Sequence, residues 1–424
     1  MTGITLSGGV VCDLSGGTVD RRDVHVAGDR FGGDGGTVVD VSGCLVTGGL
    51  ICAHHHLYSG LARGMPGPHD PPRNFIEILE RVWWRLDRAL GPETISLSAR
   101  IGALEAALAG TTTIVDHHAS PESIEGSLDL VAGGISDSGL RGVVCYEVTD
   151  RHGEERGTAG VSENVRFIQT NDRPLIRGMV GGHASFTIGD TTMEAMVAAA
   201  RDLGAPLHIH VAEDAADEKD SLDKYGLRTA HRLAGRGALV EGDLIAHGVH
   251  LDDSEIEAVR ASGAFVAHNP RSNMNNGVGY APVLKLGQRV ALGTDGIDGD
   301  MLAEAKACYL KAREASGETG VDFPIQRLVQ GQILAGSLFG EPAMGRLSAG
   351  APADLVVLDY RAPTPLDEGN LAGHLIFGTP KVRDVMVAGR WVVRDGKHTE
   401  VDEEELRAKC REVAPKLWKR MEEF

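Results

Sequence analysis

The chain has 424 residues, of which 42% are hydrophobic and 24% are charged, which is typical of a globular protein with one large domain or a large and a small one. Its formal net charge of −18 argues against binding to nucleic acid or to an anionic membrane surface, because both need a basic face. No apolar run is long enough to span a membrane, and the first residues do not resemble a secretory signal. The six cysteines include no C-x-x-C pair, so we expect free thiols in a cytoplasmic protein.

Residues 1–47 contain short apolar stretches separated by Gly and Asp, a pattern that predicts short β-strands and tight turns. From residue 48 to 343, strand-like segments alternate with helical ones. The helical segments 95–110, 192–204 and 253–263 carry apolar residues at spacings of three and four and end in Gly. The strand-like segments are LICAH, TTIVDHH, RGVVCYEV, LIRGMVGGHA, PLHIHVAE, DLIAHGVHL, AFVAHNP and RVALGTD. Eight such alternations favour an α/β fold with a parallel (β/α)8 barrel of the TIM type over an open sheet.

The pattern of short strands returns over residues 344–400, and residues 401–424 predict a helix with one apolar face. We expect that face to pack against the body of the protein or against a partner subunit. Because both flanks of the barrel are rich in β-structure, we expect 1–47 and 344–400 to form one small β-sandwich domain, with the barrel of residues 48–343 inserted between them.

Histidines and acids gather at the ends of several predicted barrel strands. In LICAHHHLY the two-residue period of a strand places His54 and His56 on one face and His55 on the other. Later strands add further candidates, namely His208, His210, Glu213, His247, His250 and Asp295. Each single residue is explained as well by a buried polar group with satisfied hydrogen bonds. The coincidence on four strand ends, where such barrels build active sites, predicts a metal centre, although the period cannot choose between His208 and His210.

The motifs GLICAHHHL, GTTTIVDHH, HIHVAE, IAHGVHL, AHNPRSN and GTDG occur in this order along the chain. They resemble the amidohydrolase superfamily, and within it the mononuclear metal aminohydrolases that include guanine deaminase and the chlorohydrolases. The resemblance covers nearly the whole chain, including GRLSAGAPADLVVLD near the C-terminus. The strings HHHLYSGLARGM, HASFTIGD and GTDGIDGDM are similar to the SsnA-type aminohydrolases of that branch.

The resemblance implies one divalent metal ion, Zn²⁺ or Fe²⁺, whose ligands are His54, His56, His210 and Asp295. It implies that Asp295 takes a proton from the attacking water, that Glu213 protonates the ring nitrogen, and that His247 holds the attacking oxygen. The expected enzyme is a hydrolase of carbon–nitrogen bonds other than peptide bonds. It would deaminate an aminated N-heterocycle, such as a purine or pterin, by attack of a metal-bound hydroxide and release of ammonia. The alternatives are a cyclic amidohydrolase that opens a hydantoin- or imidazolone-like ring, and a noncatalytic binding homologue.

Substrate contacts are expected from His183, Arg63 and His117. Each has an alternative: His183 could face the core, Arg63 could pair with a structural acid, and His118 could replace His117 at the cavity. The Pro-rich and then helical segment 66–90 suggests a flap over the barrel mouth. The only partners expected are a small heterocyclic substrate and, by analogy with the family, further copies of this chain in a homo-oligomer.

The loop after the seventh strand contains Asn269, Ser272 and Asn273, and we interpret these as residues that shape a turn. Arg271 in the same loop has no role that the sequence explains.

Overall fold

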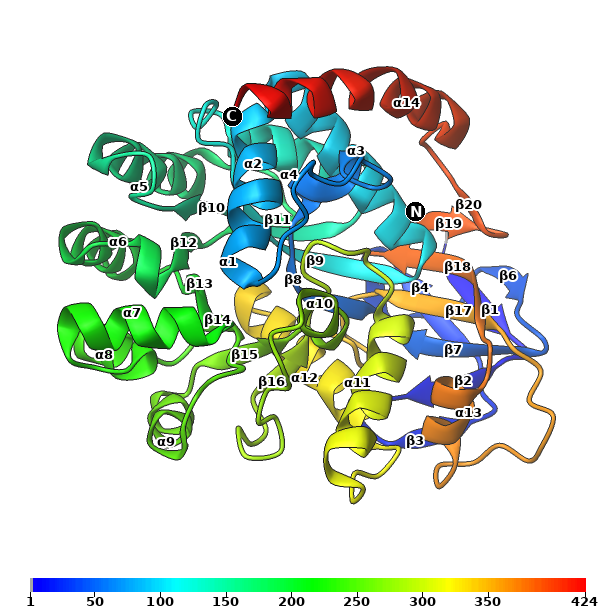
Figure 1. Cartoon of the computed structure of the whole chain (residues 1–424). Helices are drawn as coiled ribbons and strands as arrows, with labels where there is room; N and C mark the ends of the chain where they lie inside the picture. Colours follow the sequence, from blue (N-terminus) through cyan, green and yellow to red (C-terminus); the bar gives the residue numbers. More distant parts are fainter. Residues whose placement is uncertain (1–2) are drawn as a thin grey trace.

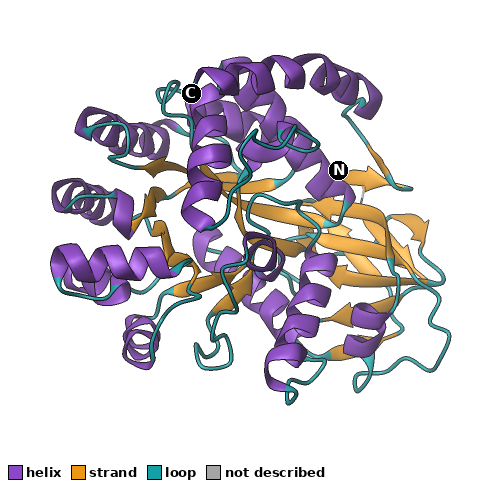
Figure 2. Ribbon diagram, in the orientation of Figure 1, coloured by secondary structure: helices purple, strands orange, loops and turns teal. Residues whose placement is uncertain are grey.

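A computed structural model describes residues 3–424 and shows a barrel of parallel strands surrounded by helices, with two smaller sheets beside it (Figure 1, Figure 2). The barrel strands are β8 (Leu50–His55), β9 (Thr111–His118), β10 (Arg141–Val148), β12 (Val180–Ala184), β13 (Leu207–Val211), β14 (Leu244–His247), β15 (Phe265–His268) and β16 (Val290–Leu292). They pair in this order and in parallel, and the short β11 (Ile176–Gly178) pairs with β10. The predicted barrel is confirmed, and all eight predicted strand segments contribute to it.

The barrel closes between its first and last strands at the carboxyl edge. Within residues 3–424, β8 and β16 are joined by an isolated bridge between His55 and Asp295. The backbone N–H groups of Thr294 and Asp295 both donate to the carbonyl oxygen of His54, at 2.9 and 3.0 Å. This seam therefore brings the beginning and the end of the barrel together where His54 and Asp295 stand.

Helices cover the outside of the barrel (Figure 2). They are α3 (Pro92–Leu108), α4 (Ser127–Asp137), α5 (Glu154–Thr170), α6 (Asp190–Leu203), α7 (Ala215–Tyr225), α8 (Thr229–Gly235), α9 (Asp253–Ser262), α10 (Pro270–Asn276), α11 (Met301–Ser316) and α12 (Phe323–Phe339), with single turns at η1 (Leu57–Leu61) and η3 (Ser185–Thr187). The three predicted helices correspond to α3, α6 and α9. Helices α6 and α9 end at Gly204 and Gly263, whose φ angles of 61° and 76° are left-handed, which explains why Gly follows each helix.

Two further sheets come from the flanks of the barrel. One contains β5 (Arg30–Phe31), β4 (Val24–Ala27), β1 (Ile4–Ser7) and β6 (Thr37–Asp40). The other contains β20 (Lys397–His398), β19 (Arg390–Arg394), β18 (Lys381–Val387), β17 (Leu355–Asp359), β7 (Cys44–Gly48), β2 (Val10–Asp13) and β3 (Thr18–Asp20), and α13 (Leu371–Phe377) lies between β17 and β18 in the chain. Antiparallel pairing of β7 with β17 joins the N-terminal and C-terminal flanks, which Figure 1 shows side by side in blue and orange. Buried residues of both sheets, among them Leu6, Val46 and Leu355, form one apolar cluster. The flanks thus make up one small sheet domain.

The C-terminal helix α14 (Glu403–Arg420) crosses the top of the molecule in Figure 1 and ends in the turn η4 (Met421–Glu423). Its buried residues Leu406, Val413 and Leu417 pack against the barrel side, where α14 contacts α3 and α2 (Trp84–Ala89). The Trp418 indole N–H donates to the carbonyl oxygen of Leu61 at 2.8 Å. Of the two packing partners expected for this face, the body of the same chain is the one observed.

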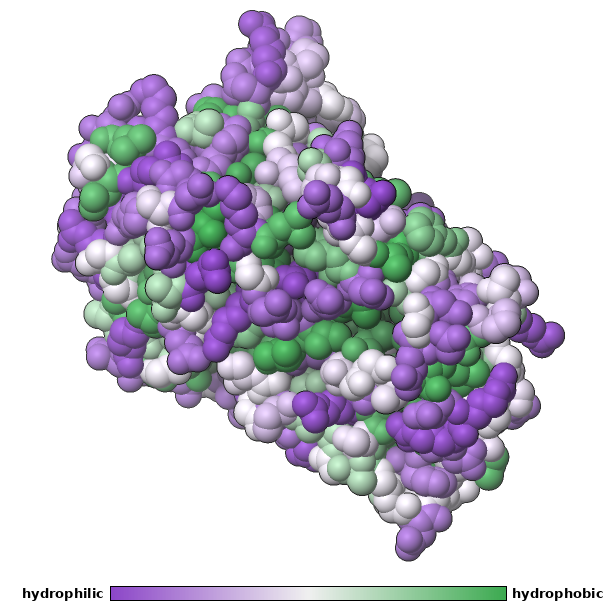
Figure 3. Space-filling model, turned by 90° about the horizontal axis from the view of Figure 1, so that it is seen from below, coloured by the Kyte–Doolittle hydropathy of each residue, from purple (hydrophilic) through white to green (hydrophobic). Residues whose placement is uncertain are grey.

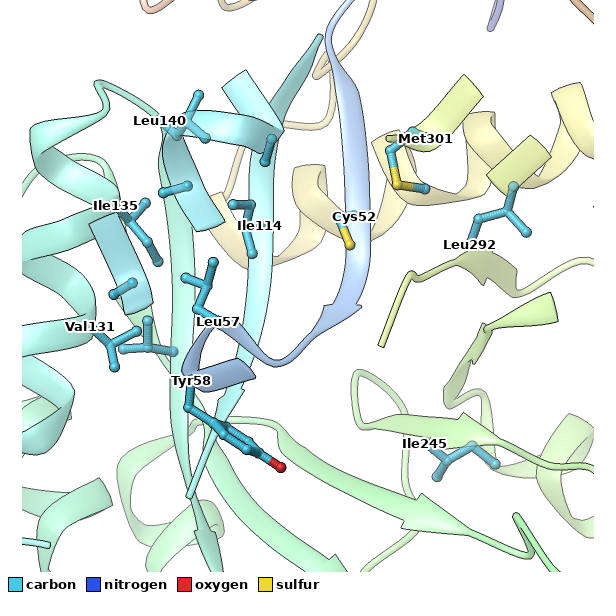
Figure 4. Packing of buried hydrophobic residues seen from close by; sticks show 14 of the residues in the cluster. Cys52, Leu57, Tyr58, Ile114, Val131, Ile135, Leu140, Ile245, Leu292 and Met301 are labelled. Carbon is cyan, nitrogen blue, oxygen red and sulfur yellow. The ribbon is translucent and has the colours of Figure 1, made fainter. Parts of the chain in front are cut away.

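The segment before α3 forms α1 (Phe75–Ile78), the π-helical turn η2 (Leu79–Trp83) and α2. Apolar side chains of the barrel wall meet those of the outer helices, and Figure 4 shows Leu57, Ile114 and Ile135 gathered in this layer. All six cysteines are buried and unpaired, as expected. No helix in residues 3–424 is long and apolar enough to cross a membrane, and the face seen in Figure 3 is largely hydrophilic with scattered apolar patches.

Candidate active site

Four side chains converge at the carboxyl edge of the barrel. His54 and His56 come from β8 and the residue after it, His210 comes from β13, and Asp295 follows β16. Each offers one ligand atom, and these atoms lie within 4.8 Å of one another. His56 Nε2 is 3.0 Å from Asp295 Oδ1 and 3.2 Å from His210 Nε2, and His54 Nε2 is 3.5 Å from Asp295 Oδ1. Three imidazoles and one carboxylate at this spacing match the coordination shell of a single divalent cation.

The hydrogen bonds behind the rings fix which nitrogen faces the cluster. His56 Nδ1 donates to the carbonyl oxygen of His117, and His210 Nδ1 donates to that of His183 at 2.7 Å. In each ring Nδ1 is thus used by the backbone, and Nε2 is the atom that faces the cluster. His54 Nε2 is buried and has no hydrogen-bond partner, which fits an atom that binds a metal ion.

His208 stands behind this cluster. Its Nε2 lies 2.9 Å from His54 Nδ1, so it supports His54 from the side away from the other candidate ligands. His55 also points elsewhere, since its Nδ1 pairs with the Thr294 hydroxyl at 2.8 Å. The geometry therefore groups His210, and neither His208 nor His55, with His54 and His56.

Burial sets the charge of this cluster. It lowers the pKa of His54 and of His210 well below the ordinary value, so both rings are neutral and suited to metal ligation. Burial opposes ionisation of Asp295, but the neighbouring imidazoles of His54 and His56 outweigh it and hold the pKa of that carboxyl well below its usual range. Burial likewise lowers the pKa of His56, but the hydrogen bond with Asp295 prevails and raises it to about 9. A cation that binds between His56 and Asp295 would displace the proton they share.

A second cluster adjoins the first and consists of Glu213, His247 and Asp295. His247 Nε2 lies 3.6 Å from Glu213 Oε2 and 4.0 Å from Asp295 Oδ2. Burial raises the pKa of Glu213 to about 7, so a large fraction of this carboxyl is protonated near neutral pH. One acid that holds a proton and one that is ionised therefore stand beside the candidate metal ligands.

His247 and Asp295 both have left-handed backbones, with φ angles of 74° and 53°. Residues other than Gly seldom adopt this conformation, which costs on the order of 1 kcal/mol or more per residue. Both residues belong to the second cluster. Backbone strain of this kind is typical of functional sites.

Helix α10 contacts all three residues of the second cluster. The Ser272 hydroxyl donates to Asp295 Oδ2, His247 Nδ1 lies 2.8 Å from Asn273 Oδ1, and Asn276 Nδ2 donates to Glu213 Oε1 at 3.4 Å. The interpretation of Ser272 and Asn273 as turn residues is thus incomplete, because the segment is a short helix. The spacing of Ser272, Asn273 and Asn276, at one and four positions in the segment after β15, could have indicated a helix with polar side chains on one face.

We expect Asn273→Ala to lower kcat/KM by about 10- to 100-fold, the usual cost of removing an outer partner of a site's histidine. The physical reason is that His247 loses the acceptor that fixes its ring and its tautomer. Steady-state kinetics together with metal analysis would check this, with Met274→Ala as the control because Met274 is 44% exposed on the same helix. Unchanged kinetics in Asn273→Ala would refute this role of Asn273.

A cavity of about 240 Å³ opens above the two clusters. His183 lines it and bonds the Thr187 hydroxyl through Nδ1 at 2.6 Å. The segment expected to be a flap also lines it, through Phe75, Trp83 and Trp84. A flat ring bound in this cavity would be covered by aromatic side chains.

Two other expected substrate contacts lie elsewhere. The Arg63 side chain is 59% exposed and pairs with Glu105 at 2.8 Å, so the alternative of a structural acid is the one observed, and Arg63 is not among the cavity-lining residues. His117 is fully buried, and its ring packs at 4.7 Å from the ring centroids of both His208 and His210. It is not among the cavity-lining residues, and its Nε2 donates instead to the carbonyl oxygen of His208 at 3.2 Å, behind the candidate ligands. His118 is no replacement, since it pairs with Ser120.

Arg271 now has an explanation. It pairs with Asp298 at 2.9 Å and with the buried Glu304, and it thereby ties α10 to the loop before α11. This bracing holds the helix that carries Ser272 and Asn273.

Three charged residues of the cavity wall, Asp87, Glu147 and Arg151, were missed from the sequence. Glu147 is the last residue but one of β10, and its carboxylate lies 3.3 Å from His117 Nδ1 and 3.8 Å from His183 Nε2. Burial opposes its ionisation, but His183, His117 and Arg151 hold the pKa of Glu147 well below its usual range. The position of Glu147 near the carboxyl end of the third strand, in CYEVTDR, was the available signal.

The sequence model of the amidohydrolase family matches residues 45–392. The chain belongs to this family. This amidohydrolase is 30% identical over 388 residues to the 5′-deoxyadenosine deaminase of Methanopyrus kandleri, an alignment that covers 88% of this chain and 86% of that protein. It is 29% identical over 412 residues to the 5-methylthioadenosine/S-adenosylhomocysteine deaminase of Halobacterium salinarum, with 94% and 92% covered.

Solved structures of the same fold include the zinc-bound adenosine deaminase of Xanthomonas campestris. It aligns with a TM-score of 0.86 at 23% identity and 98% coverage of both chains. The zinc complex of atrazine chlorohydrolase from Arthrobacter aurescens aligns with a TM-score of 0.82 at 23% identity, covering 97% of this chain and 100% of that one. The family resemblance noted from the sequence is confirmed, and the amidohydrolase is a hydrolase of carbon–nitrogen bonds.

Proposed function

We propose that this amidohydrolase removes an amino group hydrolytically from an aminated N-heterocycle and that its substrates are adenosine derivatives. The observation that carries the proposal is the pair formed by Glu213 and Asp295 beside the four candidate metal ligands. One carboxyl holds a proton and the other is ionised, which is what general acid and general base catalysis at one carbon atom requires. The curated relatives named above are deaminases of adenosine derivatives, and this supports the choice of substrate.

His54, His56, His210 and Asp295 would hold one divalent ion. Nitrogen-rich ligation favours Zn²⁺, with Fe²⁺ as the alternative for the same donor set. Bound there, the ion would act as a Lewis acid that lowers the pKa of a coordinated water to about 7, as in well-studied zinc sites. The buried, unpartnered Nε2 of His54 supports this assignment.

The protein's own groups move the protons. Asp295, oriented by the Ser272 hydroxyl, would accept a proton from the attacking water. Glu213 would donate its proton to the ring nitrogen next to the carbon under attack and would then be ionised. The proton taken by Asp295 would go to the amino group, which would leave as ammonia. The proton of the added hydroxyl would return to Glu213 as that carbon–oxygen bond becomes a carbonyl, so both carboxyls regain their starting states. His247, fixed through Asn273, would orient the attacking oxygen between the two carboxyls.

The aromatic cover explains how water is excluded from the reacting ring. Tyr58, Phe75 and Trp83 line the cavity above the clusters, so a planar heterocycle can stack there. His183 also reaches the cavity and would contact the ring through hydrogen bonding.

Ammonia release from a panel of aminated heterocycles tests the proposal. We expect release from adenosine derivatives by the metal-loaded enzyme and none after treatment with a chelator. A panel of hydantoin- and imidazolone-like cyclic amides serves as the counter-test. Ring opening of these compounds without ammonia release from any aminated ring would replace the proposed function with that of a cyclic amidohydrolase.

A further inference from the structure

The side of the cavity formed by β10 and α2 carries three buried ionisable residues, here called the acid–arginine cluster: Asp87, Glu147 and Arg151. Arg151 Nη2 lies 2.9 Å from Asp87 Oδ2 and 3.5 Å from Glu147 Oε1. The side chains are 2%, 3% and 7% exposed for Asp87, Glu147 and Arg151. Charges on these residues therefore interact with little screening by water.

Arg151 pairs with the two acids through a single nitrogen, Nη2. Its guanidinium lies over the Trp84 ring at 4.7 Å from the centroid. Its Nε and Nη1 atoms are buried without hydrogen-bond partners, so they are closed off from the cavity. An incoming ligand thus finds no open face on the guanidinium.

Acidic residues outnumber Arg and Lys around the cavity. Its described lining includes four acids, Asp87, Glu147, Glu213 and Asp295, and Arg151 is the one Arg or Lys among those lining residues. A cation at the His54 centre would offset the two acids that stand beside it, Glu213 and Asp295. In the acid–arginine cluster, the two acids already pair with the guanidinium of Arg151. An anionic group that entered this part of the cavity would lose its hydration shell, and no unpaired cationic side chain would offset that desolvation cost.

We propose that Asp87 and Glu147, by occupying Arg151, make this enzyme select uncharged substrates and reject those that carry a carboxylate or phosphate. The proposal deepens the proposed function, on which it rests, because it separates neutral adenosine derivatives from anionic ones. Asp87 and Glu147 are then specificity-determining residues, and Arg151 is an anion site that the wild-type protein keeps closed.

Matched substrate pairs measure the selection directly. Adenosine is compared with its 5′-monophosphate, and 5′-deoxyadenosine with adenosine 5′-carboxylate, by kcat/KM for ammonia release from the metal-loaded enzyme. We expect the uncharged member of each pair to be preferred by at least about tenfold, since unfavourable charge placement in a site costs a few kcal/mol. Equal or better turnover of the anionic members would overturn the inference while leaving the proposed function intact.

Variants test whether the two acids are responsible. Glu147→Gln and Asp87→Asn keep nearly the same side-chain shape but remove one acid that pairs with Arg151. Each should lower the ratio of kcat/KM for the uncharged substrate to that for the anionic one. Adding Arg151→Met to either variant should bring this ratio back towards the wild-type value. Glu194→Gln, at a surface carboxylate with 63% exposure, is the matched control. A preference that stays the same in both single variants, with folding verified by circular dichroism, would refute the role of the acids.

Binding of inorganic phosphate gives a readout that does not depend on turnover. By calorimetry we expect Glu147→Gln and Asp87→Asn to bind phosphate at least about tenfold more tightly than the wild type, in a manner abolished by Arg151→Met. If no nucleoside is deaminated, the proposed function fails, and this measurement still decides the charge argument. Equal phosphate affinity in the wild type and both single variants would overturn it.

Discussion

Glu213→Gln is expected to lower kcat by about 10²- to 10⁴-fold, the usual contribution of a general acid or base. Glutamine keeps the size and the contact with Asn276 but cannot release a proton to the ring nitrogen. Because burial raises the pKa of Glu213 to about 7, the wild-type carboxyl carries the needed proton near neutral pH. Steady-state kinetics of ammonia release would measure the loss, and metal analysis should find the same metal content as in the wild type.

The control for this experiment is Glu194→Gln, the same chemical change on the exposed surface of α6. It should behave like the wild type. A Glu213→Gln enzyme of normal turnover would remove Glu213 from the mechanism. A loss of activity that is accompanied by loss of metal would assign Glu213 to metal binding instead.

His56→Ala is expected to abolish metal binding and, with it, activity. His56 Nε2 stands between Asp295 and His210, at 3.0 and 3.2 Å, so its removal takes out the central donor of the cluster. The cation also stabilises the fold that binds it, by about 4 kcal/mol when its free concentration is a thousand times the dissociation constant. Metal content by plasma emission and thermal unfolding with and without a chelator would show both effects.

The neighbouring His55→Asn is the matched comparison. His55 is as buried as its neighbours but pairs with Thr294, so asparagine should lower the free energy of unfolding without releasing the metal. Metal loss in His55→Asn, or full metal content in His56→Ala, would contradict the assignment of ligands.

The sequence predicts those site residues whose position follows from the geometry of a single strand. Alternation along a strand separates His55 from His54 and His56, and the placement of active sites at strand ends points to Glu213, His247 and Asp295. The choice of His210 over His208 had no local rule and came from the family resemblance. In the structure it follows from which imidazole reaches the Nε2 atoms of its neighbours.

What the sequence did not reveal depends on contacts between distant segments. Asp87 and Arg151 meet only because α2 folds over the end of β10, and neither position stands out in its own segment. Arg63 lies in a loop that follows the first strand, yet its side chain turns outward to Glu105. Loop direction and long-range ion pairs are set by tertiary packing, which no short window of sequence contains.

The seam between β8 and β16 also bears on the order of events during folding. His54 and His56 lie on the first barrel strand, and Asp295 follows the last, so the donor set is complete only after the two strands have met. Contacts between the two ends of a long chain segment form late, because closing the intervening chain costs entropy that only the finished barrel repays. A newly made chain would therefore hold its cation firmly only once the whole barrel has closed, and capture of the cation would mark the completed fold.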